Sequence, residues 1–461
     1  EYYSGSARAI RYMNYTYLER SYDPTLFDLE SNRHDILLSE IGQNAETSIN
    51  WYTNLYEKRK ANTPVIRKPS NLNSSDLCLE IINNIPILQS EQAIPIPFRV
   101  RTGNAPSKSL HVLVNDIPLN GSKGFPLSIP SQSTLDTSLI IDLSKGENRL
   151  EYYLTDSGNR ESARYYQKVV YRPIAPLKPK MFLISLGVTH YRDSAYNLTY
   201  AAKDGDDLTS AFKSLYKEQF EVRVLKLQDS LVNRQSLDRI RLFLQSAQPD
   251  DYVYMYFSGH GLLDSSYRLF LATHDMDFNH PEVSGILAQE LEWVLSACKS
   301  RQKILFLDAC HSGLVDRDLM GNEMDAKPID QSVNTKGGRS TSNASASQKL
   351  VFNQMRAIYA DLSESTGVNV FAAAGGLEFA LESQDWKNGA FTHCLLKLLN
   401  DGCAQADGNN DYAVDVRELF GSLSNEVMEL THGRQQPVSR NEIRTPFTML
   451  DCSDVFDFFD E

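Results

Sequence analysis

The second half of the chain alternates short apolar segments with segments of helical periodicity. The apolar segments cover Lys180–Gly187 and residues 220–226, 251–257, 303–307 and 369–373. Amphipathic stretches cover residues 198–216, 233–247, 288–299, 391–400 and 416–431. Strands that are apolar along nearly their whole length are buried on both faces, which is typical of a parallel sheet covered by helices. We therefore predict an α/β fold with a mostly parallel sheet and helices on both faces.

The composition argues against several classes of function. The chain of 461 residues carries 46 Lys and Arg against 59 Asp and Glu, a formal net charge of −13, and such a surface repels phosphate backbones. Its apolar runs are far shorter than the roughly 18 residues that cross a bilayer. The six cysteines are scattered without a CxxC pair, so we expect neither a disulfide framework nor a zinc knuckle. We expect a cytoplasmic protein that binds neither membranes nor, directly, nucleic acid.

Four changes in pattern divide the chain. Residues 1–75 form an N-terminal segment, for which the end of an upstream regulatory domain is one candidate. Residues 77–172 hold short alternating strands between turn residues, which predicts a small immunoglobulin-like β-sandwich. The α/β pattern follows in two segments, 180–314 and 350–461. Residues 315–349 between them are rich in Asp, Asn, Ser and Gly, which predicts a flexible linker.

Two of the apolar strands run directly into reactive side chains. Residues 251–257 lead into SGHG at 258–261, and residues 303–307 lead into DACHSG at 308–313. Sites in open α/β sheets form at the carboxyl ends of strands. A histidine beside a thiol can take the thiol proton, which is the minimum for nucleophilic catalysis. We interpret the glycines beside His260 as letting the backbone approach a substrate, and we predict a site here rather than a core histidine and a buried thiol.

The two motifs, with His260 and Cys310 separated by 50 positions, resemble those of caspase-like cysteine peptidases, specifically the metacaspase, paracaspase and bacterial orthocaspase branch of peptidase C14. The resemblance covers about 180–430 and implies a large catalytic segment at 180–314 and a small one at 350–461. It implies that His260 is the general base and acid and that Cys310 is the nucleophile. We expect the N–H groups of Gly261 and Cys310 to stabilise the oxyanion. His311 competes for the role of base, but a place on the helical side of the turn would aim it elsewhere.

The same resemblance implies a substrate class. Caspases that cut after Asp have Gln two residues before the cysteine, whereas this chain has Asp308. In metacaspases and paracaspases an aspartate there, with another on the first helix, binds Arg or Lys. Asp204 matches the helix position, and Ser258 matches a serine that lines the pocket. Carboxylates in a partly dry pocket bind a guanidinium through charge-assisted hydrogen bonds. The plainer interpretation of Asp204 is a solvated helix face shared with Asp206 and Asp207.

Calcium is the one candidate ligand, and we expect no cofactor to be required. Metacaspases are often activated by calcium through an aspartate cluster. Asp275 matches its first member, but Ala288 and Gln289 replace the next two, so we expect no calcium at that site. Residues 407–418 match the EF-hand loop at five positions, namely Asp407, Asn409, Asp411, Asp415 and Glu418. The sixth position requires Gly and is Tyr412, so a polar turn between helices is the plainer interpretation.

The linker also offers cleavage sites for the proposed acidic pocket. Lys336 and Arg339 flank two glycines in its most polar stretch, and exposed polar loops are preferred sites of proteolysis. If the linker is processed, we expect the cut after one of them, and the plainer interpretation is an inert insert that needs no cleavage.

The leading hypothesis is a cysteine endopeptidase that cleaves proteins after Arg or Lys. We expect regulation by its N-terminal region or by a partner protein, and analogy with bacterial relatives suggests a defence or cell-death pathway. The alternatives are a non-catalytic interaction module with the caspase fold and a protease of the CHAT or separase type. Degenerate modules usually lose His or Cys, and this chain has both.

Overall fold

The structure is a computed structural model, and it divides the chain into two compact units, the first up to Ile174 and the second from Ala175. It describes residues 15–17, 20–22, 33–40, 49, 52–53, 56–57, 77–82, 85–121, 123–158, 161–162, 164–175, 178–264, 268–311, 333–335, 367–373, 380–401, 403–440 and 447–452. The earliest described elements are the antiparallel pair β1 (Tyr15–Tyr17) and β2 (Arg20–Tyr22) and the helix α3 (His34–Glu40).

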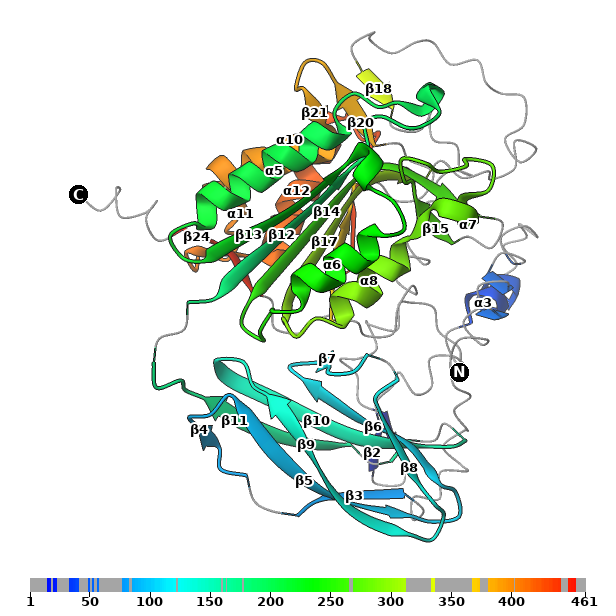
Figure 1. The fold of residues 1–461 in the computed structure, drawn as a ribbon, viewed down its shortest axis with the longest axis vertical. Coiled ribbons are helices and arrows are strands. Elements are labelled where there is room, and N and C mark those ends of the chain that lie inside the picture. The colour runs from blue at the N-terminus through cyan, green and yellow to red at the C-terminus, as the bar shows by residue number, and fades with distance from the viewer. Residues whose placement is uncertain are drawn as a thin grey trace. The chain divides into compact units, whose positions relative to one another are not determined.

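Among the described residues from Leu77 on, the first unit contains two largely antiparallel sheets (Figure 1). One contains β3 (Leu77–Ile81), β5 (Ala93–Thr102) and β9 (Thr134–Asp142). The other contains β4 (Leu88–Gln89), β6 (Ser107–Val114), β7 (Ile117–Pro118), β8 (Phe125–Ile129), β10 (Gly146–Asp156) and β11 (Tyr165–Tyr171), with only the β4–β11 pair parallel.

The two sheets share one apolar core because side chains alternate along each strand. Phe98 of β5 and Tyr152 of β10 meet there, with ring centroids 5.3 Å apart. The turn between β6 and β7 holds Asn115 and Asp116 at φ values of 53° and 69°, a left-handed conformation that these residue types tolerate. The first unit is therefore rich in β-structure, as predicted, and its immunoglobulin-like class stays a prediction.

A central sheet organises the second unit. Its strands lie in the order β13 (Glu221–Gln228), β12 (Lys180–Gly187), β14 (Tyr252–Leu263), β17 (Gln302–His311), β19 (Asn369–Ala372) and β23 (Val438–Arg440). The first five are parallel, and β23 runs antiparallel to β19. The short strands β15 (Leu269–Leu271) and β16 (Ile286–Leu287) extend the sheet beside the end of β14. The mostly parallel sheet predicted from the apolar segments is thus confirmed.

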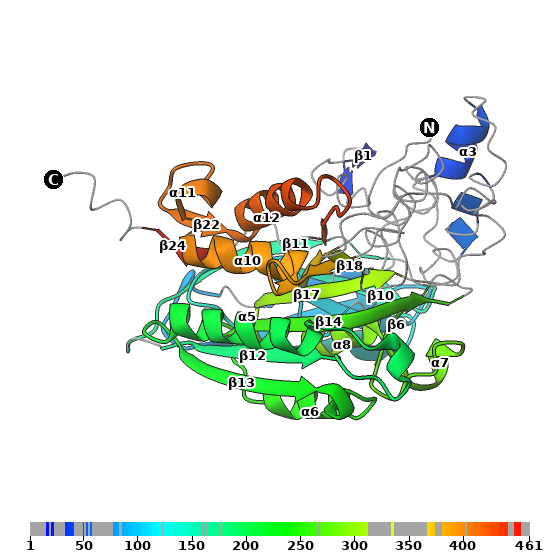
Figure 2. The same ribbon diagram turned by 90° about the horizontal axis from the view of Figure 1, so that it is seen from above.

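Helices cover both faces of this sheet, with α5 and α10 on one side of the strands and α6 and α8 on the other (Figure 1). Seen from above, α5 lies in front of the strands (Figure 2). On the first face, α5 (Ala201–Tyr216), α10 (Ala390–Asp401) and α12 (Val416–Leu430) share one core with the strands. On the other face, α6 (Ser236–Leu244) lies beside α8 (Ala288–Ser296), and Phe182 of β12 packs against Phe243 of α6 at 5.4 Å between ring centroids. Two shorter helices are α7 (Pro281–Ser284) and α11 (Cys403–Ala406).

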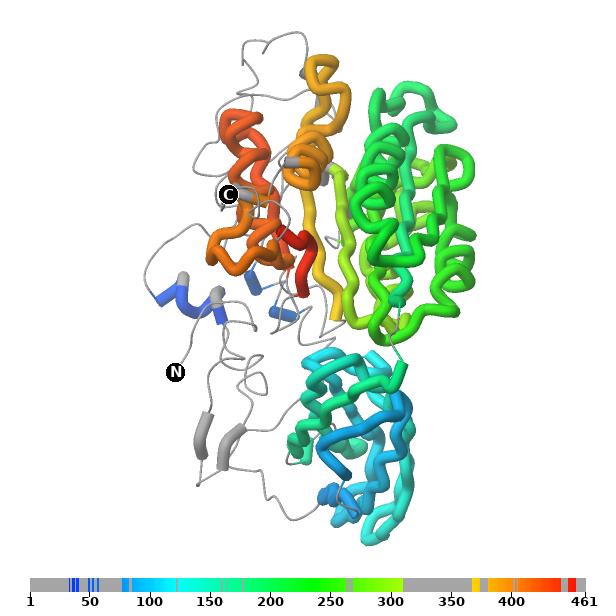
Figure 3. The backbone as a smooth tube through the Cα atoms, turned by 90° about the vertical axis from the view of Figure 1, so that its left-hand side faces the viewer, coloured from blue at the N-terminus to red at the C-terminus, as the bar shows by residue number. Residues whose placement is uncertain are grey.

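Residues on either side of the predicted linker pair with each other in the sheet. Figure 3 shows β17 and β19 side by side, and Ile304 to Leu307 pair with Asn369 to Ala372. Within 315–349 the structure describes one piece, β18 (Val333–Thr335), which pairs with β20 (Leu381–Ser383), itself paired with β21 (Asn388–Gly389). That piece is a paired strand and not the unstructured chain we expected, because its main chain bonds to the edge of β20. The predicted cleavage sites Lys336 and Arg339 lie outside the described residues.

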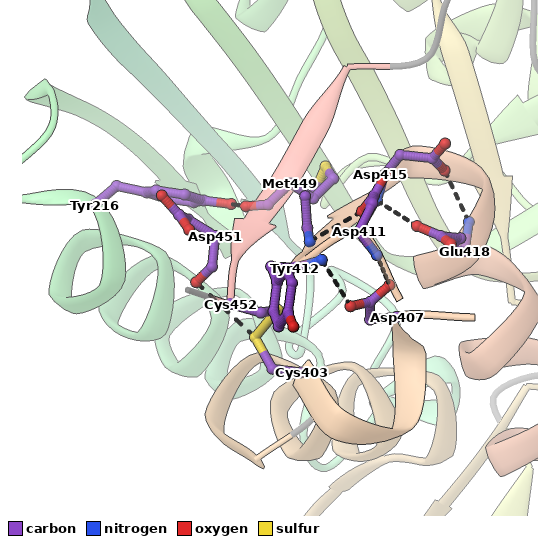
Figure 4. Close-up of a disulfide and its surroundings, with 11 residues drawn as sticks. Tyr216, Cys403, Asp407, Asp411, Tyr412, Asp415, Glu418, Met449, Asp451 and Cys452 are labelled. Carbon is purple, nitrogen blue, oxygen red and sulfur yellow. Dashed lines mark hydrogen bonds between the residues drawn. A yellow bond between two sulfur atoms is a disulfide. The ribbon is translucent and has the colours of Figure 1, made fainter. Parts of the chain in front are cut away.

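The structure contains a disulfide that the scattered cysteine spacing did not indicate. Cys403 and Cys452 are bonded, with Cα atoms 5.5 Å apart (Figure 4). They come together because β22 (Ala413–Asp415) pairs with β24 (Thr448–Asp451), and the Cys452 N–H donates to the carbonyl of Tyr412 at 2.8 Å. From their apolar, helical surroundings we had interpreted Cys298, Cys394 and Cys403 as packing residues. Cys394 is buried in the core, which raises its thiol pKa to about 12, but for Cys403 the disulfide shows that this interpretation was wrong.

Replacing Cys452 by Ser should lower the stability of the second unit. The bond closes a loop over a sequence separation of 49 residues, and removal of a native disulfide commonly costs about 2–5 kcal/mol. Urea unfolding with and without a reductant measures this. Wild type should lose its advantage in the reductant, whereas Cys452→Ser should not respond. Cys298→Ser, which changes a thiol outside the bond, should behave like wild type. An equal response of Cys452→Ser and wild type to the reductant would contradict the assignment.

Among the described residues, every helix is too short or too polar to span a bilayer.

Candidate active site

The register of β14 and β17 places the predicted site residues side by side. Ser258 lies opposite Asp308, His260 opposite Cys310, and Gly261 opposite His311. Positions two apart on a strand belong to the same face of the sheet. Positions 258, 260, 308 and 310 therefore share one face at the carboxyl edge. The structure describes Cys310 and His311 by their backbones alone. We had expected His311 on the helical side of a turn. The strand β17 instead extends through His311, so this residue belongs to the strand.

The topology explains why the site lies at this edge. Helix α5 follows β12 on one face of the sheet, and α6 precedes β14 on the other, so adjacent parallel strands have helices on opposite faces. Such a switch point is where open α/β sheets bind ligands. The loop 188–200 leaves β12 at this point and reaches the end of β14.

His260 is held at its ring by that loop. Its side chain is buried, with 6% of the residue exposed, and Nε2 lies 2.8 Å from the carbonyl oxygen of Tyr196. A carbonyl only accepts hydrogen bonds, so Nε2 carries the hydrogen and donates it. In the neutral ring the lone pair then resides on Nδ1, and a general base needs such a lone pair.

Aromatic rings surround the imidazole. Phe278 stacks on Tyr196 with 3.6 Å between ring centroids, and it meets the His260 ring edge-on at 5.6 Å. The Tyr191 ring lies 5.1 Å from the imidazole, and its phenol oxygen accepts the main-chain N–H of His260 at 2.9 Å. We had predicted none of these three residues, because nothing local in the sequence ties them to His260.

The glycine before His260 has a different role from the one we expected. A Cβ at Gly259 would lie 2.9 Å from the phenol oxygen of Tyr191 and 3.1 Å from the Phe257 ring. The missing side chain therefore makes room for Tyr191 rather than for a substrate. Gly261, predicted as an oxyanion donor, lies between two strands: it is opposite His311 of β17 on one side and Leu271 of β15 on the other.

Asp204 lies in the interior and not on a solvated helix face. It stands in the first turn of α5 and is fully buried, as is Ser258. One carboxylate oxygen accepts the side-chain amide of Asn388 and the main-chain N–H of Gly389, both at 3.0 Å. The Ser258 hydroxyl lies 3.5 Å from the other oxygen. The plainer interpretation of Asp204 was therefore wrong.

Its neighbours on α5 behave as that interpretation had expected. Asp206 is half-buried and pairs with Lys226 at 2.8 Å, and Asp207 pairs with Lys203. Asp207 also accepts the Asn388 amide at 2.9 Å, so one helical turn carries one fully buried carboxylate and two half-buried ones.

Asp308 is fully buried beside the same group of residues. One of its oxygens accepts the Tyr256 phenol and the Thr392 hydroxyl, each at 3.0 Å. Burial raises the pKa of Tyr256 well above its usual value, and the negative charges of Asp308 and Asp204 raise it further. Ser258 lies opposite Asp308 and 3.5 Å from an oxygen of Asp204, so the fold brings the two predicted specificity residues together. Tyr256 and Thr392 were not predicted, since neither belongs to a motif.

The small segment also fixes the start of α5. The two carboxylate oxygens of Glu382 in β20 accept the N–H groups of Thr199 and Tyr200, at 3.1 and 3.3 Å. These residues end the loop that contacts His260. The strand that pairs with the linker is thus also the strand that holds this loop.

The first calcium candidate is occupied by protein groups. Asp275 accepts the Thr273 hydroxyl at 3.0 Å and lies 3.9 Å from the Arg192 guanidinium. Ala288 and Gln289 begin α8.

The second candidate, residues 407–418, adopts a closed loop (Figure 4). Asp407 accepts the N–H groups of Asp411 and Tyr412 at 3.2 and 3.0 Å. Tyr412 has a φ of 63°, which explains why an EF-hand prefers Gly there. Asp415 and Glu418 form a capping box at the start of α12. In the described part of the chain, no group of three or more His, Cys, Asp or Glu side chains is arranged to hold a metal ion. Calcium at this loop stays a prediction, as does the polar turn.

A mostly parallel sheet with a histidine and a cysteine side by side near the carboxyl ends of adjacent strands is an arrangement suited to a cysteine peptidase. The caspase domain of peptidase family C14 matches residues 182–448. The chain therefore belongs to the caspase family of cysteine peptidases. No curated protein matches it. Among solved structures, the chain is similar to the crystal structure of protein GSU0716 from Geobacter sulfurreducens, at 18% identity and a TM-score of 0.37, over 57% of this chain and 93% of the other.

Proposed function

We propose that this caspase-family protein cleaves polypeptides after Arg or Lys, with Cys310 as nucleophile and His260 as base. The observation that carries the specificity is the place of Ser258, which lies opposite Asp308 in the sheet and 3.5 Å from a carboxylate oxygen of Asp204. Two buried carboxylates beside the nucleophile favour a cationic side chain before the scissile bond.

The proposed reaction follows from the orientation of His260. Nε2 donates to the Tyr196 carbonyl, so Nδ1 takes the thiol proton of Cys310. The thiolate attacks the peptide carbonyl, and the N–H groups of Gly261 and Cys310 stabilise the oxyanion. The imidazolium then gives its proton to the leaving amine. A water molecule, deprotonated by the same ring, hydrolyses the thioester and restores the thiol.

The test compares peptides that differ only in the residue before the scissile bond. Freshly reduced wild type should cleave the Arg and Lys peptides and leave the Asp peptide intact, and Cys310→Ala should cleave none. If wild type cleaved no peptide and a thiol-reactive peptide probe failed to label Cys310, a non-catalytic interaction module would be favoured. Proteome-wide mapping of cleaved bonds with the same two proteins would separate this peptidase from one of the CHAT or separase type.

Calcium should not be required for this cleavage. Asp275 already has Arg192 and Thr273 as neighbours, and Ala288 and Gln289 bring no carboxylate. The rate with the Arg peptide should be unchanged in a calcium chelator. Activity that the chelator removes and calcium restores would contradict this expectation. Loss of that response in Asp407→Ala would assign the effect to the loop 407–418.

Two further parts of the proposal concern biological context. Regulation by the N-terminal region or by a partner protein, in bacterial defence or cell death, is proposed by analogy.

Self-processing after Lys336 or Arg339 is checked by comparing the intact masses of wild type and Cys310→Ala after incubation. If the active enzyme cuts its own linker, only wild type should be cut.

A further inference from the structure

We propose that Tyr191 is a positioning residue for His260 and that Gly259 is a glycine because Tyr191 must reach the strand there. This inference rests on the proposed function, since it assigns how the base of the dyad is held. Tyr191 does not touch the substrate in this proposal, and it acts through the main chain of His260.

Tyr191 contacts the histidine at its backbone. The phenol oxygen accepts the main-chain N–H of His260 at 2.9 Å. Tyr191 is 4% exposed, so this hydrogen bond is shielded from water. A buried main-chain N–H requires an acceptor. The phenol supplies it at the residue that carries the base.

The loop that carries Tyr191 also holds the imidazole itself. The N–H of Tyr191 donates to the side-chain oxygen of Asn197 at 2.8 Å, which closes the loop on itself. Tyr196, adjacent to Asn197, provides the carbonyl that accepts Nε2 of His260. The ring of Tyr191 meets Phe278 at 5.4 Å between centroids, and Phe278 stacks on Tyr196. One loop therefore fixes His260 at two points, the main chain and the ring.

The space at Gly259 is matched to the phenol. A Cβ there would approach the Tyr191 oxygen to 2.9 Å, which is closer than such atoms pack, so any larger residue would displace the hydroxyl. The same hydroxyl thus accepts the N–H of His260 and fills the space beside the preceding residue, Gly259. Removing it, or filling its space, should disturb His260 in the same way.

The expected consequence is a fall in turnover with little change in substrate binding. Tyr191→Phe should lower kcat about 10-fold, because general acid–base catalysis depends on the position of the base. KM should change less than about twofold, since the acidic pocket is built from other residues. Gly259→Ala should also lower kcat about 10-fold.

The double variant Tyr191→Phe/Gly259→Ala separates this proposal from two independent structural defects. If both substitutions act through the contact between the hydroxyl and position 259, the double variant should lose no more than either single one. Independent defects would multiply to about 100-fold. A 100-fold loss, or a full kcat in Tyr191→Phe, would overturn the proposal.

Tyr216→Phe is the matched control for the loss of a buried tyrosine hydroxyl. Tyr216 is the last residue of α5, at the end of the helix opposite to Asp204, and its hydroxyl donates to the carbonyl of Met449. The variant should be less stable in urea and should keep its kcat. An equal fall in kcat in Tyr216→Phe would mean that the effect of Tyr191→Phe is a general loss of stability.

A second readout keeps this inference distinct from the proposed function. Alkylation of Cys310 by iodoacetamide, followed by mass spectrometry of its peptide, reports the thiolate without any substrate. Tyr191→Phe should slow it about 10-fold. Unchanged alkylation together with unchanged kcat would remove the role of Tyr191 and leave the peptidase proposal intact. Slowed alkylation in a protein that cleaves no peptide would keep Tyr191 as a positioning residue and reject the peptidase.

Discussion

Cys310→Ala and His260→Ala should each abolish peptide cleavage, with residual turnover below about one thousandth of wild type. Without the thiol there is no nucleophile, and without the imidazole there is no acid for the leaving amine. Cleavage of an Arg peptide measures both variants. Circular dichroism and urea unfolding should show that both remain folded. Turnover above about 1% in Cys310→Ala would show that another group attacks the peptide.

Two further variants make this result specific. His311→Ala removes the competing imidazole, which lies in register with Gly261 on β17, and should keep most of the activity. If His311→Ala were inactive and His260→Ala active, the base would be His311. Cys298→Ser changes a half-buried thiol outside the site and should match wild type.

Asp308→Asn should reduce cleavage after Arg by about 30-fold or more. Removing one partner of a buried charge pair costs about 2–5 kcal/mol, and each 1.36 kcal/mol is tenfold in rate. The substitution keeps the shape of the side chain, and an amide oxygen can still accept from Tyr256 and Thr392, so the loss reports the missing charge. The measurement is kcat/KM with Arg and Asp peptides.

The matched control for this prediction is Asp206→Asn. Asp206 is a half-buried carboxylate of α5 that pairs with Lys226, and its loss should change kcat/KM less than about twofold, because exposed ion pairs contribute little. Faster cleavage after Asp than after Arg by wild type would overturn the acidic-pocket interpretation, whatever the variants do.

The sequence predicted the strands that carry the site because their signal is local. The neighbouring strand β12 is apolar along most of its length, and its bounds agree with the prediction at both ends. The strands β14 and β17 continue past their predicted ends through the two motifs. The two motifs then had to lie at one edge of the sheet, since β14 and β17 are parallel neighbours. The parallel strands, the reactive residues that they carry and the edge of the sheet at which these residues lie were therefore all predictable.

The surroundings of those residues were not predictable, because they come from distant parts of the chain. Asp204 is buried by Asn388, which is 184 residues away, so its helix alone looked solvated. Tyr191 reaches His260 across 69 residues. Contacts between residues so far apart in the chain produce no local pattern, so they cannot be recognised in a single sequence. The disulfide between Cys403 and Cys452 was missed for the same reason.

The position of that disulfide has a consequence for a chain cut in its linker. Both of its cysteines lie within 350–461, so it cannot hold the large segment to the small one. The two fragments would stay together through β17 and β19, and through the bonds of Asp204 and Glu382. Non-reducing denaturing electrophoresis should then separate two bands that migrate as one species in native chromatography. The cut protein would be a heterodimer of two fragments that share one sheet, and their association would depend on concentration. Its activity should therefore fall on dilution, whereas the activity of the intact chain should not.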